Sequence, residues 1–538
     1  MGHPRTRIWL AAASLPIALA VPAPALADVN SRQAERIADA RPEVEEVEAG
    51  RGELEVSVTS DDAAAWRVSY FDRDREVAQV IVERDDGAVR EAWTGHQVAW
   101  RMARGYEGQF GHKLNAPYVW IPLAIVFFFG LLDWRRPWRI VHLDLLVLLS
   151  FGISHIFFNQ GEIGFSVPLA YPPLVYLLAR GLQIGFHGRS EGLRPTAPVV
   201  WLAVAVVFLL AFRVTMNVVD SGVIDVGYSG VIGADRIAHG EAIYGEHAFP
   251  TDNATGDTYG PANYYAYVPL ELVLPWSGSW DELPAAHGAA IAFDLATVVG
   301  LFFLGWRLRR DATGRPTTQG TALGVTLAFA WVAYPYTAFA LQSNSNDSLV
   351  SALLVWALVA FSSAPARGIL LGLAGMTKFA PLALAPLFAT GQRGLAGRPP
   401  WRPVLAFAGA FVAAVALMLA HPAIDPGLAT FWDRTLGSQL DRSSPFSVWG
   451  QEPGLDWLQT AIWTAAAALA GLVAFVPRTR SLAQVAALGA AVLVAAQLAV
   501  DHWFYLYIPW FLPLLLAALS SRGSRPASAP TSPSSSGP

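Results

Sequence analysis

The sequence predicts a polytopic α-helical membrane protein with a small exported α+β domain near its N-terminus. Of the 538 residues, 54% are hydrophobic and only 15% are charged, and the mean hydropathy is +0.38. Soluble proteins usually carry roughly 25% charged residues. The charged residues also cluster between apolar runs, which are long enough to cross a hydrocarbon core of roughly 30 Å. We therefore expect most of the chain to lie in a membrane.

Composition and missing motifs exclude several classes of function. The chain has no cysteine, which rules out disulfides, thiolate metal sites and a cysteine nucleophile. The net charge is −5, and no basic run suits a nucleic acid. Phosphate-binding glycine loops, a G-x-S-x-G elbow and zinc-like spacings are absent from the sequence. We therefore expect no direct use of nucleotide energy, no firmly implied cofactor and no metal site, with a divalent ion in an acidic outer loop left open.

Residues 1–27 have the pattern of a secretory signal peptide. Arg5 and Arg7 precede an apolar stretch from Ile8 to Val21, and Ala25-Leu26-Ala27 resembles a cleavage site. An uncleaved anchor is the alternative. Both interpretations place the following residues outside the cytoplasm.

Residues 28–113 predict an exported α+β domain. Ser31 could cap a short helix through Ala40. Four stretches with alternating apolar residues follow, separated by turn residues, which is typical of a small antiparallel sheet. This order of a helix and then strands resembles a PepSY-type domain. A solvated lid or docking module without chemistry of its own is the simpler interpretation.

From Tyr118 onward, apolar runs alternate with short charged loops. We expect eleven spans, at 118–133, 140–158, 165–182, 197–216, 284–306, 320–341, 347–361, 403–420, 458–476, 481–500 and 504–520. Three additional N-terminal spans lie in 114–196, and the remaining spans form a module over 197–522. The Ser/Pro/Ala-rich residues 523–538 predict a disordered cytoplasmic tail.

The arginines predict which loops face the cytoplasm. They follow the first, third, fifth, seventh, ninth and last expected spans: Arg135, Arg136 and Arg139; Arg189 and Arg194; Arg307, Arg309, Arg310 and Arg315; Arg367; Arg478 and Arg480; and Arg522 and Arg525. Cytoplasmic loops of membrane proteins carry an excess of Lys and Arg. This bias places the N-terminal domain and two long loops, 217–283 and 421–457, outside a plasma (inner) membrane. The signal peptide independently predicts the same orientation.

The apolar stretch 368–391 interrupts the simple alternation. Arginines flank it on both sides, so a single crossing would invert every later loop. We favour a re-entrant hairpin of two short helices, with Gly375, Lys378 and Pro381 near its tip. Irregular backbone at this depth is tolerated where protein buries it or where it lines a watery cavity.

The first outer loop contains candidate catalytic acids. Asp220, Asp225 and Asp235 follow shortly after the fourth expected span. A carboxylate at the membrane surface can act as general base on a hydroxyl. Capping of short helices or pairing with Arg236 would explain the same acids without catalysis. Farther along, Tyr259 belongs to an aromatic stretch, 257–269, that could bind a sugar or form an interfacial belt.

Lys378 is the candidate for binding a phosphate. Only two of the 37 basic residues are lysines, and this one lies in an apolar stretch. Inserting a lysine at the centre of a membrane helix costs about 2.5–3.5 kcal/mol, so such residues are usually functional. Its ammonium could bind a lipid phosphate. It could also extend to the interface, or pair with Asp347 or Asp294.

Two further residues are candidates for the same phosphate. Arg213 lies near the outer end of the fourth expected span and could instead form a salt bridge with Asp220. His502 lies at the outer end of the tenth expected span. A hydrogen bond with the neighbouring Asp501 would explain it without a ligand.

Five polar or aromatic residues are candidates for binding a sugar or an acceptor. Asn344, Asn346 and Asp347 lie at the outer junction of the sixth and seventh expected spans, and Arg442 and Trp449 lie in the second outer loop. Amides and carboxylates suit sugar hydroxyls. Asn346 and Asp347 could instead cap the next helix.

Several short strings resemble a known family. They are GADRIAHGEAIYG at 233–245, NSNDS at 344–348, GMTKFAPLALAPL at 375–387 and RSSPFSVWG at 442–450. Over about 197–520 the chain resembles the GT-C superfamily of membrane glycosyltransferases. More narrowly, it resembles the polyprenol-phosphate-mannose-dependent mannosyltransferase-like proteins of actinobacteria.

The resemblance implies a mechanism. In that superfamily an aspartate of the first outer loop is the base, the donor is a polyprenyl-phosphate sugar, and transfer inverts the anomeric centre. Asp225 matches best because it precedes the Gly-Tyr and GADR strings, with Asp220 and Asp235 in reserve. The superfamily places this loop after its first span, whereas here it follows the fourth.

The sequence therefore predicts a glycosyltransferase of the cell envelope. It would move a sugar, with mannose the first choice, from a lipid-linked donor to an extracytoplasmic lipid or glycan acceptor. The alternative is a transporter or flippase of a lipid-linked sugar, although no internal repeat is evident. A third possibility is a membrane anchor whose residues 28–113 bind a partner in the cell wall.

Overall fold

The computed structural model describes residues 28–520 except 62, 74, 100, 106–110, 189, 247, 251–252, 254, 280–282, 312, 441–443 and 453. The predicted signal peptide and C-terminal tail lie outside the described residues, as does Arg442. The chain divides into two units, Met1–Arg104 and Gly105–Pro538, each described by itself below. The first unit ends at Arg104, before the expected boundary at 113. Lys113 belongs to the second unit, where its backbone N–H donates to Asp220.

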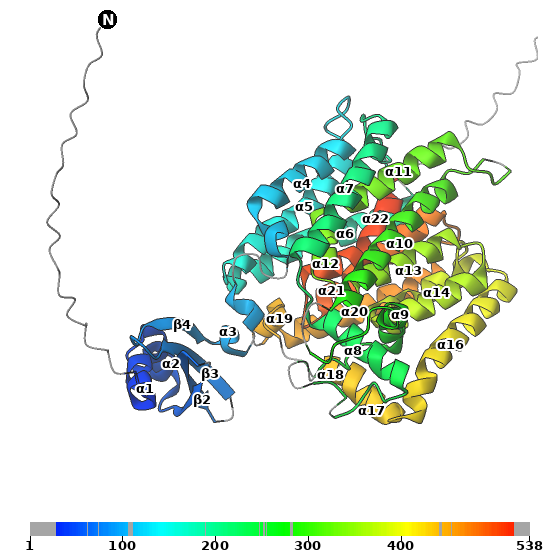
Figure 1. Cartoon of the computed structure of the whole chain (residues 1–538). Helices are drawn as coiled ribbons and strands as arrows, with labels where there is room; N and C mark the ends of the chain where they lie inside the picture. The colour runs from blue at the N-terminus through cyan, green and yellow to red at the C-terminus, as the bar shows by residue number, and fades with distance from the viewer. Residues whose placement is uncertain are drawn as a thin grey trace, which may run out of the picture. The chain divides into compact units, whose positions relative to one another are not determined.

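In the first unit helical residues precede the strands, as expected, but they form two helices where one was predicted (Figure 1). Its elements are α1 (Ser31–Asp39), α2 (Pro42–Arg51), β1 (Glu55–Ser60), β2 (Ala65–Asp72), β3 (Arg75–Glu83), β4 (Val89–Thr94), α3 (His96–Ala99) and η1 (Arg101–Arg104). The four strands form an antiparallel sheet in sequence order. Asn30, and not the expected Ser31, caps α1, because its side chain accepts the N–H of Gln33 in a capping box.

The second unit is a helical bundle. Its longer helices are α4 (Pro117–Leu131), α5 (Ile140–Asn159), α6 (Ile163–His187), α7 (Val199–Asp220), α8 (Asp225–His239), α9 (Pro261–Glu271), α10 (Pro284–Leu308), α11 (Thr318–Ala333), α12 (Pro335–Gln342), α13 (Asp347–Val359), α14 (Ala364–Thr377), α16 (Trp401–Ile424), α20 (Asp456–Phe475), α21 (Leu482–Ala499) and α22 (Ile508–Leu519). Its short helices are η2 (His112–Asn115), η4 (Ala380–Leu384), α15 (Ala385–Thr390), η5 (Leu395–Gly397), α17 (Leu428–Trp432), η6 (Asp433–Gly437), α18 (Ser438–Leu440), α19 (Val448–Gln451) and η7 (Tyr505–Tyr507).

Among the described residues, six helices are long and apolar enough to cross a membrane. They are α5, α7, α10, α16, α20 and α21, and α11 with α12 would add a seventh. Helices also occupy the other predicted spans, but α4, α13 and Tyr505–Leu519 are shorter than the roughly 20 residues that a crossing needs. The structure thus agrees with a helical membrane protein, and the number of eleven spans stays a prediction.

The predicted span 320–341 is not one straight helix. It breaks into α11 and α12, whose axes differ by 60°. Pro335 is the first residue of α12, and a proline has no N–H to continue the hydrogen-bond ladder. The Trp331 carbonyl, left without that donor, accepts hydrogen bonds from Arg213 and Thr337.

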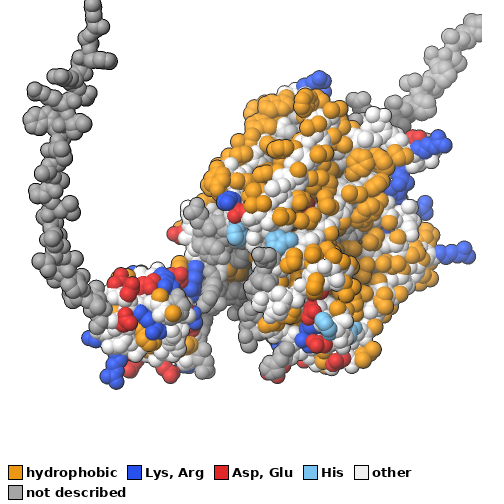
Figure 2. Space-filling view, in the orientation of Figure 1, with side chains coloured by type: hydrophobic (Ala, Val, Ile, Leu, Met, Phe, Trp, Pro, Cys, Tyr) orange, Lys and Arg blue, Asp and Glu red, His pale blue; other side chains and the backbone are white. Residues whose placement is uncertain are grey.

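The outer helices of the bundle expose apolar side chains. In α7, α16 and α20, only 17%, 11% and 22% of the most apolar stretch is buried, against 83% in α21. Phe208 on α7 is 68% exposed and Leu405 on α16 is 67% exposed. Apolar side chains cover most of the bundle surface in the space-filling view (Figure 2). A surface of this extent is unfavourable in water and suits contact with lipid.

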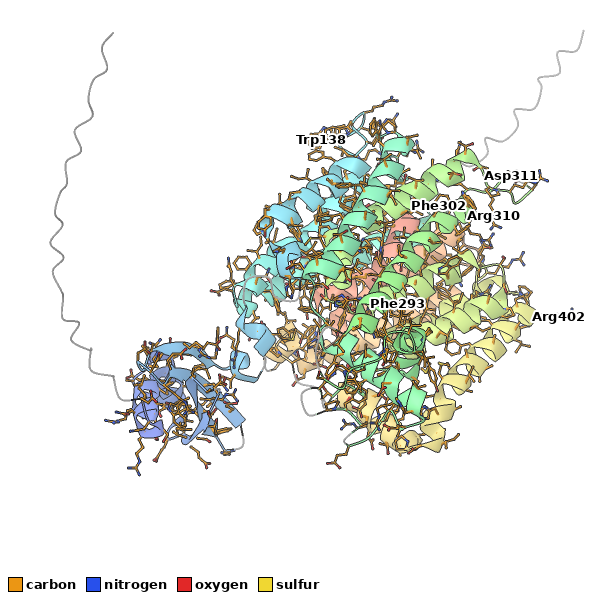
Figure 3. The ribbon with its side chains drawn as sticks, in the orientation of Figure 1. Trp138, Phe293, Phe302, Arg310, Asp311 and Arg402 are labelled. Carbon is orange, nitrogen blue, oxygen red and sulfur yellow. The ribbon has the colours of Figure 1, made fainter. Side chains whose placement is uncertain are left out.

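The arginine-rich loops meet at one end of the bundle. Arg139 donates to the carbonyl of Glu191, and Arg309 donates to the carbonyl of Ser520. These contacts join the loops that follow the first, third, fifth and last predicted spans. Figure 3 shows Arg310 at this end, and Figure 1 shows α8, α17 and α18 at the opposite end. The predicted cytoplasmic and outer loops therefore lie at opposite ends of the bundle.

Residues 364–390 fold back as the predicted hairpin. Arg367, at the start of α14, donates to the carbonyls of Phe388 (2.8 Å) and Ala389 (3.5 Å) at the end of α15. The two ends of this segment therefore lie side by side. Lys378 follows α14 directly, at the turn where the chain reverses into η4.

Candidate functional site

The turn between α12 and α13, residues 342–347, organises the end of the bundle that carries the predicted outer loops. The N–H groups of Gly222 and Ile224 donate to the carbonyls of Gln342 and Ser343, both at 3.2 Å. The chain between α7 and α8 is therefore fixed to this turn. Asn344 adopts a left-handed backbone conformation (φ +49°), which reverses the chain between the two helices.

Asn344 has a structural role in this turn. Its amide nitrogen donates to Ser221 Oγ and to the Gly222 carbonyl, both at 3.0 Å. Its amide oxygen accepts from Asn217 at 2.8 Å. Both N–H bonds of this buried side chain are therefore used within the protein, which differs from the predicted contact with a sugar.

Asp225 is the first residue of α8, and its side chain is exposed. The N-cap residue of α8, Ile224, is held on the turn, and Asn253 donates to the Asp225 carbonyl at 3.2 Å. A Cβ on Gly227 would lie 2.4 Å from the Asn344 carbonyl oxygen, so only a glycine allows α8 to approach the turn this closely. The carboxylate thus projects from a backbone that is fixed on two sides.

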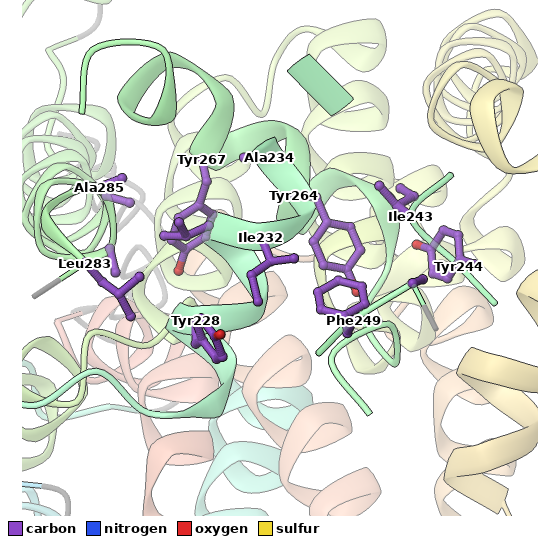
Figure 4. Packing of buried hydrophobic residues seen from close by; sticks show 14 of the residues in the cluster. Tyr228, Ile232, Ala234, Ile243, Tyr244, Phe249, Tyr264, Tyr267, Leu283 and Ala285 are labelled. Atoms are coloured by element: carbon purple, nitrogen blue, oxygen red, sulfur yellow. The ribbon is translucent and has the colours of Figure 1, made fainter. Parts of the chain in front are cut away.

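The residues of α8 that follow Asp225 pack into a buried aromatic cluster. Tyr228, Val231 and Ile232 contact residues of the same cluster on α9, including Tyr264 and Tyr267 (Figure 4). Gly230 and Gly233 on α8 lie against the Tyr267 and Tyr264 rings, where a Cβ would collide. This packing fixes the orientation of α8 and α9 relative to each other.

The two reserve acids have partners in this structure. Asp220 accepts the backbone N–H of Lys113 at 3.3 Å, and the Lys113 ammonium lies 3.5 Å away. Asp235 lies 3.2 Å from His239. A hydrogen bond to the Asp235 carbonyl and the nearby carboxylate raise the pKa of His239.

Lys378 lies between three segments that are far apart in the sequence. Its ammonium is 2.6 Å from Asp347 Oδ1, and Trp510 Nε1 donates to the same oxygen at 2.7 Å. The ring centroids of Tyr259, Tyr507 and Trp510 lie 5.7, 5.6 and 5.1 Å from the ammonium. Aromatic faces attract cations at such distances. Of the alternatives that the sequence left open, pairing with Asp347 is observed and pairing with Asp294 is not.

Arg213 pairs inside the bundle and not with Asp220. It lies two helical turns before the end of α7, where its guanidinium is 2.9 Å from Asp294 Oδ1. Trp331 Nε1 donates to the same oxygen at 2.8 Å. Arg213 is 2% exposed and therefore lies too deep to meet a phosphate at the outer surface.

His502 and Trp449 also contact partners that the sequence did not predict. Ser444 Oγ lies 2.9 Å from His502 Nδ1, while Asp501 accepts from Gln459. Trp449 is buried, and its indole N–H donates to the Leu498 carbonyl at 3.1 Å. These contacts give Trp449 a structural role. The predicted role of Arg442 concerns a residue outside the described part of the chain.

An ion pair between the two outer loops was missed by the sequence reasoning. Arg434 donates to both oxygens of the buried Asp257, with distances of 2.6 and 2.8 Å. The backbone N–H of Gly245 donates to the same carboxylate at 3.1 Å. Hydrogen bonding to Asp257 raises the pKa of Arg434. Asp257 stood in the aromatic stretch noted above, but nothing local identifies a partner 177 residues away.

This end of the bundle combines an exposed carboxylate, a shielded ammonium and several amides and hydroxyls. Such groups can bind a phosphate ester and can take a proton from a hydroxyl. Within the described residues, no group of three or more His, Asp or Glu side chains could hold a metal ion.

Comparison with known proteins adds no family assignment. No family model matches the chain, and no curated protein matches its sequence. Any function must therefore be argued from the residues and their geometry.

Proposed function

We propose that this protein is a membrane glycosyltransferase of the GT-C type. It transfers a sugar, with mannose the first choice, from a polyprenyl phosphate to a lipid or glycan acceptor outside the plasma membrane. The apolar belt of the bundle supports a lipid-borne donor, which reaches the site from within the bilayer. The energy comes from the phosphate–sugar bond, in line with the absence of any nucleotide-binding motif from the sequence.

The turn at 342–347 is the observation that carries this proposal. At one end it fixes the start of α8, which bears Asp225. At the other end its Asp347 binds the Lys378 ammonium. A candidate base and a candidate phosphate ligand, 153 positions apart in the sequence numbering, are thus attached to one six-residue support.

The proposed reaction is a single displacement. The acceptor hydroxyl attacks the anomeric carbon, and the bond from that carbon to the phosphate oxygen breaks with inversion. Asp225 takes the acceptor proton, and polyprenyl phosphate leaves with the electron pair of the broken bond. Transfer of a proton to a positioned carboxylate accelerates such reactions by about 10²- to 10⁴-fold.

Lys378 stabilises the leaving phosphate. An ammonium has three N–H donors, so one can remain on Asp347 while the others bind phosphate oxygens. Asp347 and Trp510 then keep the ammonium in place, and the surrounding aromatic rings limit access of water. A cation in such an environment stabilises developing negative charge more strongly than it would in bulk water.

The proposal is tested by Asp225→Asn. The assay uses proteoliposomes with radiolabelled polyprenyl-phosphate mannose and an extracted envelope-lipid acceptor. We expect the variant to lower label transfer by about 10²- to 10⁴-fold, because the Asn amide cannot take the acceptor proton near neutral pH. The matched control is Asp456→Asn, since Asp456 is also an exposed first residue of a helix, α20. It should transfer label as the wild type does.

Two results would contradict the proposal. Undiminished transfer by Asp225→Asn would remove the base assignment. Absence of transfer by the wild type with mannose, glucose and arabinose donors alike would contradict the assignment of the protein as a glycosyltransferase.

A flippase of a lipid-linked sugar is the second candidate. The break between α11 and α12 favours it, because discontinuous helices are common in transporters. The same proteoliposomes distinguish the two functions. A flippase moves the labelled lipid between leaflets without forming a labelled product.

A further inference from the structure

Five buried polar side chains meet where α9 contacts the start of α13. They form the α9–α13 polar cluster: Asn263, Tyr267, Asn346, Asp347 and Ser348. Each is at most 1% exposed. Each also has an atom without a hydrogen-bond partner among the described residues, namely Asn263 Nδ2, Tyr267 OH, Asn346 Oδ1, Asp347 Oδ2 and Ser348 Oγ.

The members of the cluster are close neighbours. Asn346 donates to Asn263 Oδ1 at 2.7 Å, so its side chain makes no capping hydrogen bond although it occupies the N-cap position of α13. Asn263 and Tyr267 are four residues apart on α9, so they share one face of the helix. Burial and, after it, the charge of Asp347 raise the pKa of the Tyr267 phenol.

Such a concentration of unused polar atoms points to a ligand. A buried donor or acceptor without a partner costs free energy, and native proteins contain only a few per 100 residues. Here three belong to the consecutive residues 346–348, and two more lie on one face of α9, whose Asn263 is hydrogen-bonded to Asn346. A bound group that supplies the missing partners would remove this cost.

The charge of the cluster selects a neutral ligand. Asp347 is its only ionised member, and Lys378 already lies 2.6 Å from that carboxylate. A cation would be repelled by the lysine, and an anion by the aspartate. Whichever way the two amides are turned, the asparagine pair offers one unpartnered NH2 group and one unpartnered carbonyl oxygen. Ser348 and Tyr267 add hydroxyls, which both donate and accept.

We infer that the α9–α13 polar cluster binds the ring hydroxyls of the sugar carried by the lipid donor. Sugar hydroxyls donate to Asp347 and Asn346 and accept from Asn263. The phosphate of the same donor lies at Lys378, so Asp347 contacts the sugar through one oxygen and the phosphate-binding lysine through the other. Tyr259 and Tyr507 beside Lys378 are only partly buried, so the sugar would reach the cluster on this side. This inference rests on the proposed function and names what selects its substrate.

Binding of two lipids to the full-length protein in nanodiscs tests the inference. One probe is polyprenyl-phosphate mannose, and the other is polyprenyl phosphate without a sugar. Tyr267→Phe and Ser348→Ala each remove an atom that has no partner among the described residues, so neither variant should lower the melting temperature. We expect each to weaken binding of the sugar-bearing lipid about threefold to tenfold, the value of one hydrogen bond, and to leave the other lipid unaffected.

Tyr336→Phe is the matched control. The Tyr336 hydroxyl is also buried without a partner in the described structure, but its ring packs against His155 and Tyr505, away from the cluster. This variant should bind both lipids as the wild type does. The inference is overturned if the wild type binds both lipids equally, or if Tyr267→Phe and Ser348→Ala weaken both or neither.

Its failure is distinct from failure of the proposed function. If label transfer stops in Asp225→Asn but sugar binding is unchanged in Tyr267→Phe, the enzyme assignment is supported and the assignment of the cluster as the sugar site is contradicted. If the protein prefers the sugar-bearing lipid but transfers no label, the cluster is supported as the sugar site and the enzyme assignment is contradicted.

Discussion

Two oppositely charged pairs are buried inside the bundle. Arg213 and Asp294 are 2% and 1% exposed and lie 2.9 Å apart. Arg180 and Asp144 form a second pair at 2.9 Å, with exposures of 4% and 0%. A charge at this depth is tolerated when a partner compensates for the lost hydration. Pairing therefore explains these residues without assigning them to catalysis.

Replacing one member of such a pair should destabilise the protein more than replacing both members. We expect Asp294→Leu to cost about 3–5 kcal/mol, because it leaves the Arg213 guanidinium buried without its anion. The double variant Arg213→Met with Asp294→Leu should lie close to the wild type, since it leaves no unpaired charge. Thermal unfolding in detergent, followed by tryptophan fluorescence, measures the difference. Equal melting temperatures for the single and double variants would contradict the pairing.

At the scale of elements, the hairpin places Lys378 at the outer end of the bundle. Arg367 holds the two ends of the segment together through the carbonyls of Phe388 and Ala389. Arg480 binds the Gly391 carbonyl at 2.6 Å, so the chain leaves the hairpin beside another arginine-rich loop. The fold-back of this segment agrees with the predicted re-entrant hairpin, which would explain how flanking arginines and a buried lysine occur in one short stretch.

Cysteine labelling tests the sidedness of the hairpin. Because the native chain has no cysteine, single replacements have no background. In intact cells, Arg398→Cys should resist an impermeant thiol reagent, since the loop after the hairpin is predicted to be cytoplasmic. Glu246→Cys, in the first outer loop, should react. Labelling at position 398 from outside would refute the hairpin topology.

For the whole molecule, the distribution of apolar surface is the main constraint. The bundle has an apolar belt over α7, α16 and α20, and an arginine-rich end beyond it. Backbone groups in the bilayer must bond within the protein, which helices achieve. These features agree with a membrane protein whose outer helices contact lipid.

A lysine in the belt should impair insertion. Phe208→Lys places an ammonium on the exposed face of α7, which costs about 2.5–3.5 kcal/mol on insertion scales. We expect less protein in the carbonate-resistant membrane fraction. Trp138→Lys is the control, because Trp138 is 98% exposed in an arginine-rich loop and a further cation belongs there. Equal amounts of both variants would show that α7 does not face lipid.

Local patterns alone predicted much of the architecture. The alternation in residues 54–93 gave the antiparallel sheet, and the apolar runs gave the positions of the bundle helices. Arginines on both sides of 368–391 led to the hairpin. These features follow from periodicity and charge within one segment, so no knowledge of tertiary contacts is needed to predict them. The break at Pro335 was overlooked, although the proline itself was the signal.

The partners of the site residues were decided by tertiary structure. Asp257 meets Arg434, Asn346 meets Asn263, and Arg213 meets Asp294 across 177, 83 and 81 residues. Composition shows that a polar side chain in an apolar segment needs a partner, but only the packing of helices determines which one it reaches. The amino-acid sequence therefore determined which residues were candidates, whereas the fold decided which remain available to a ligand.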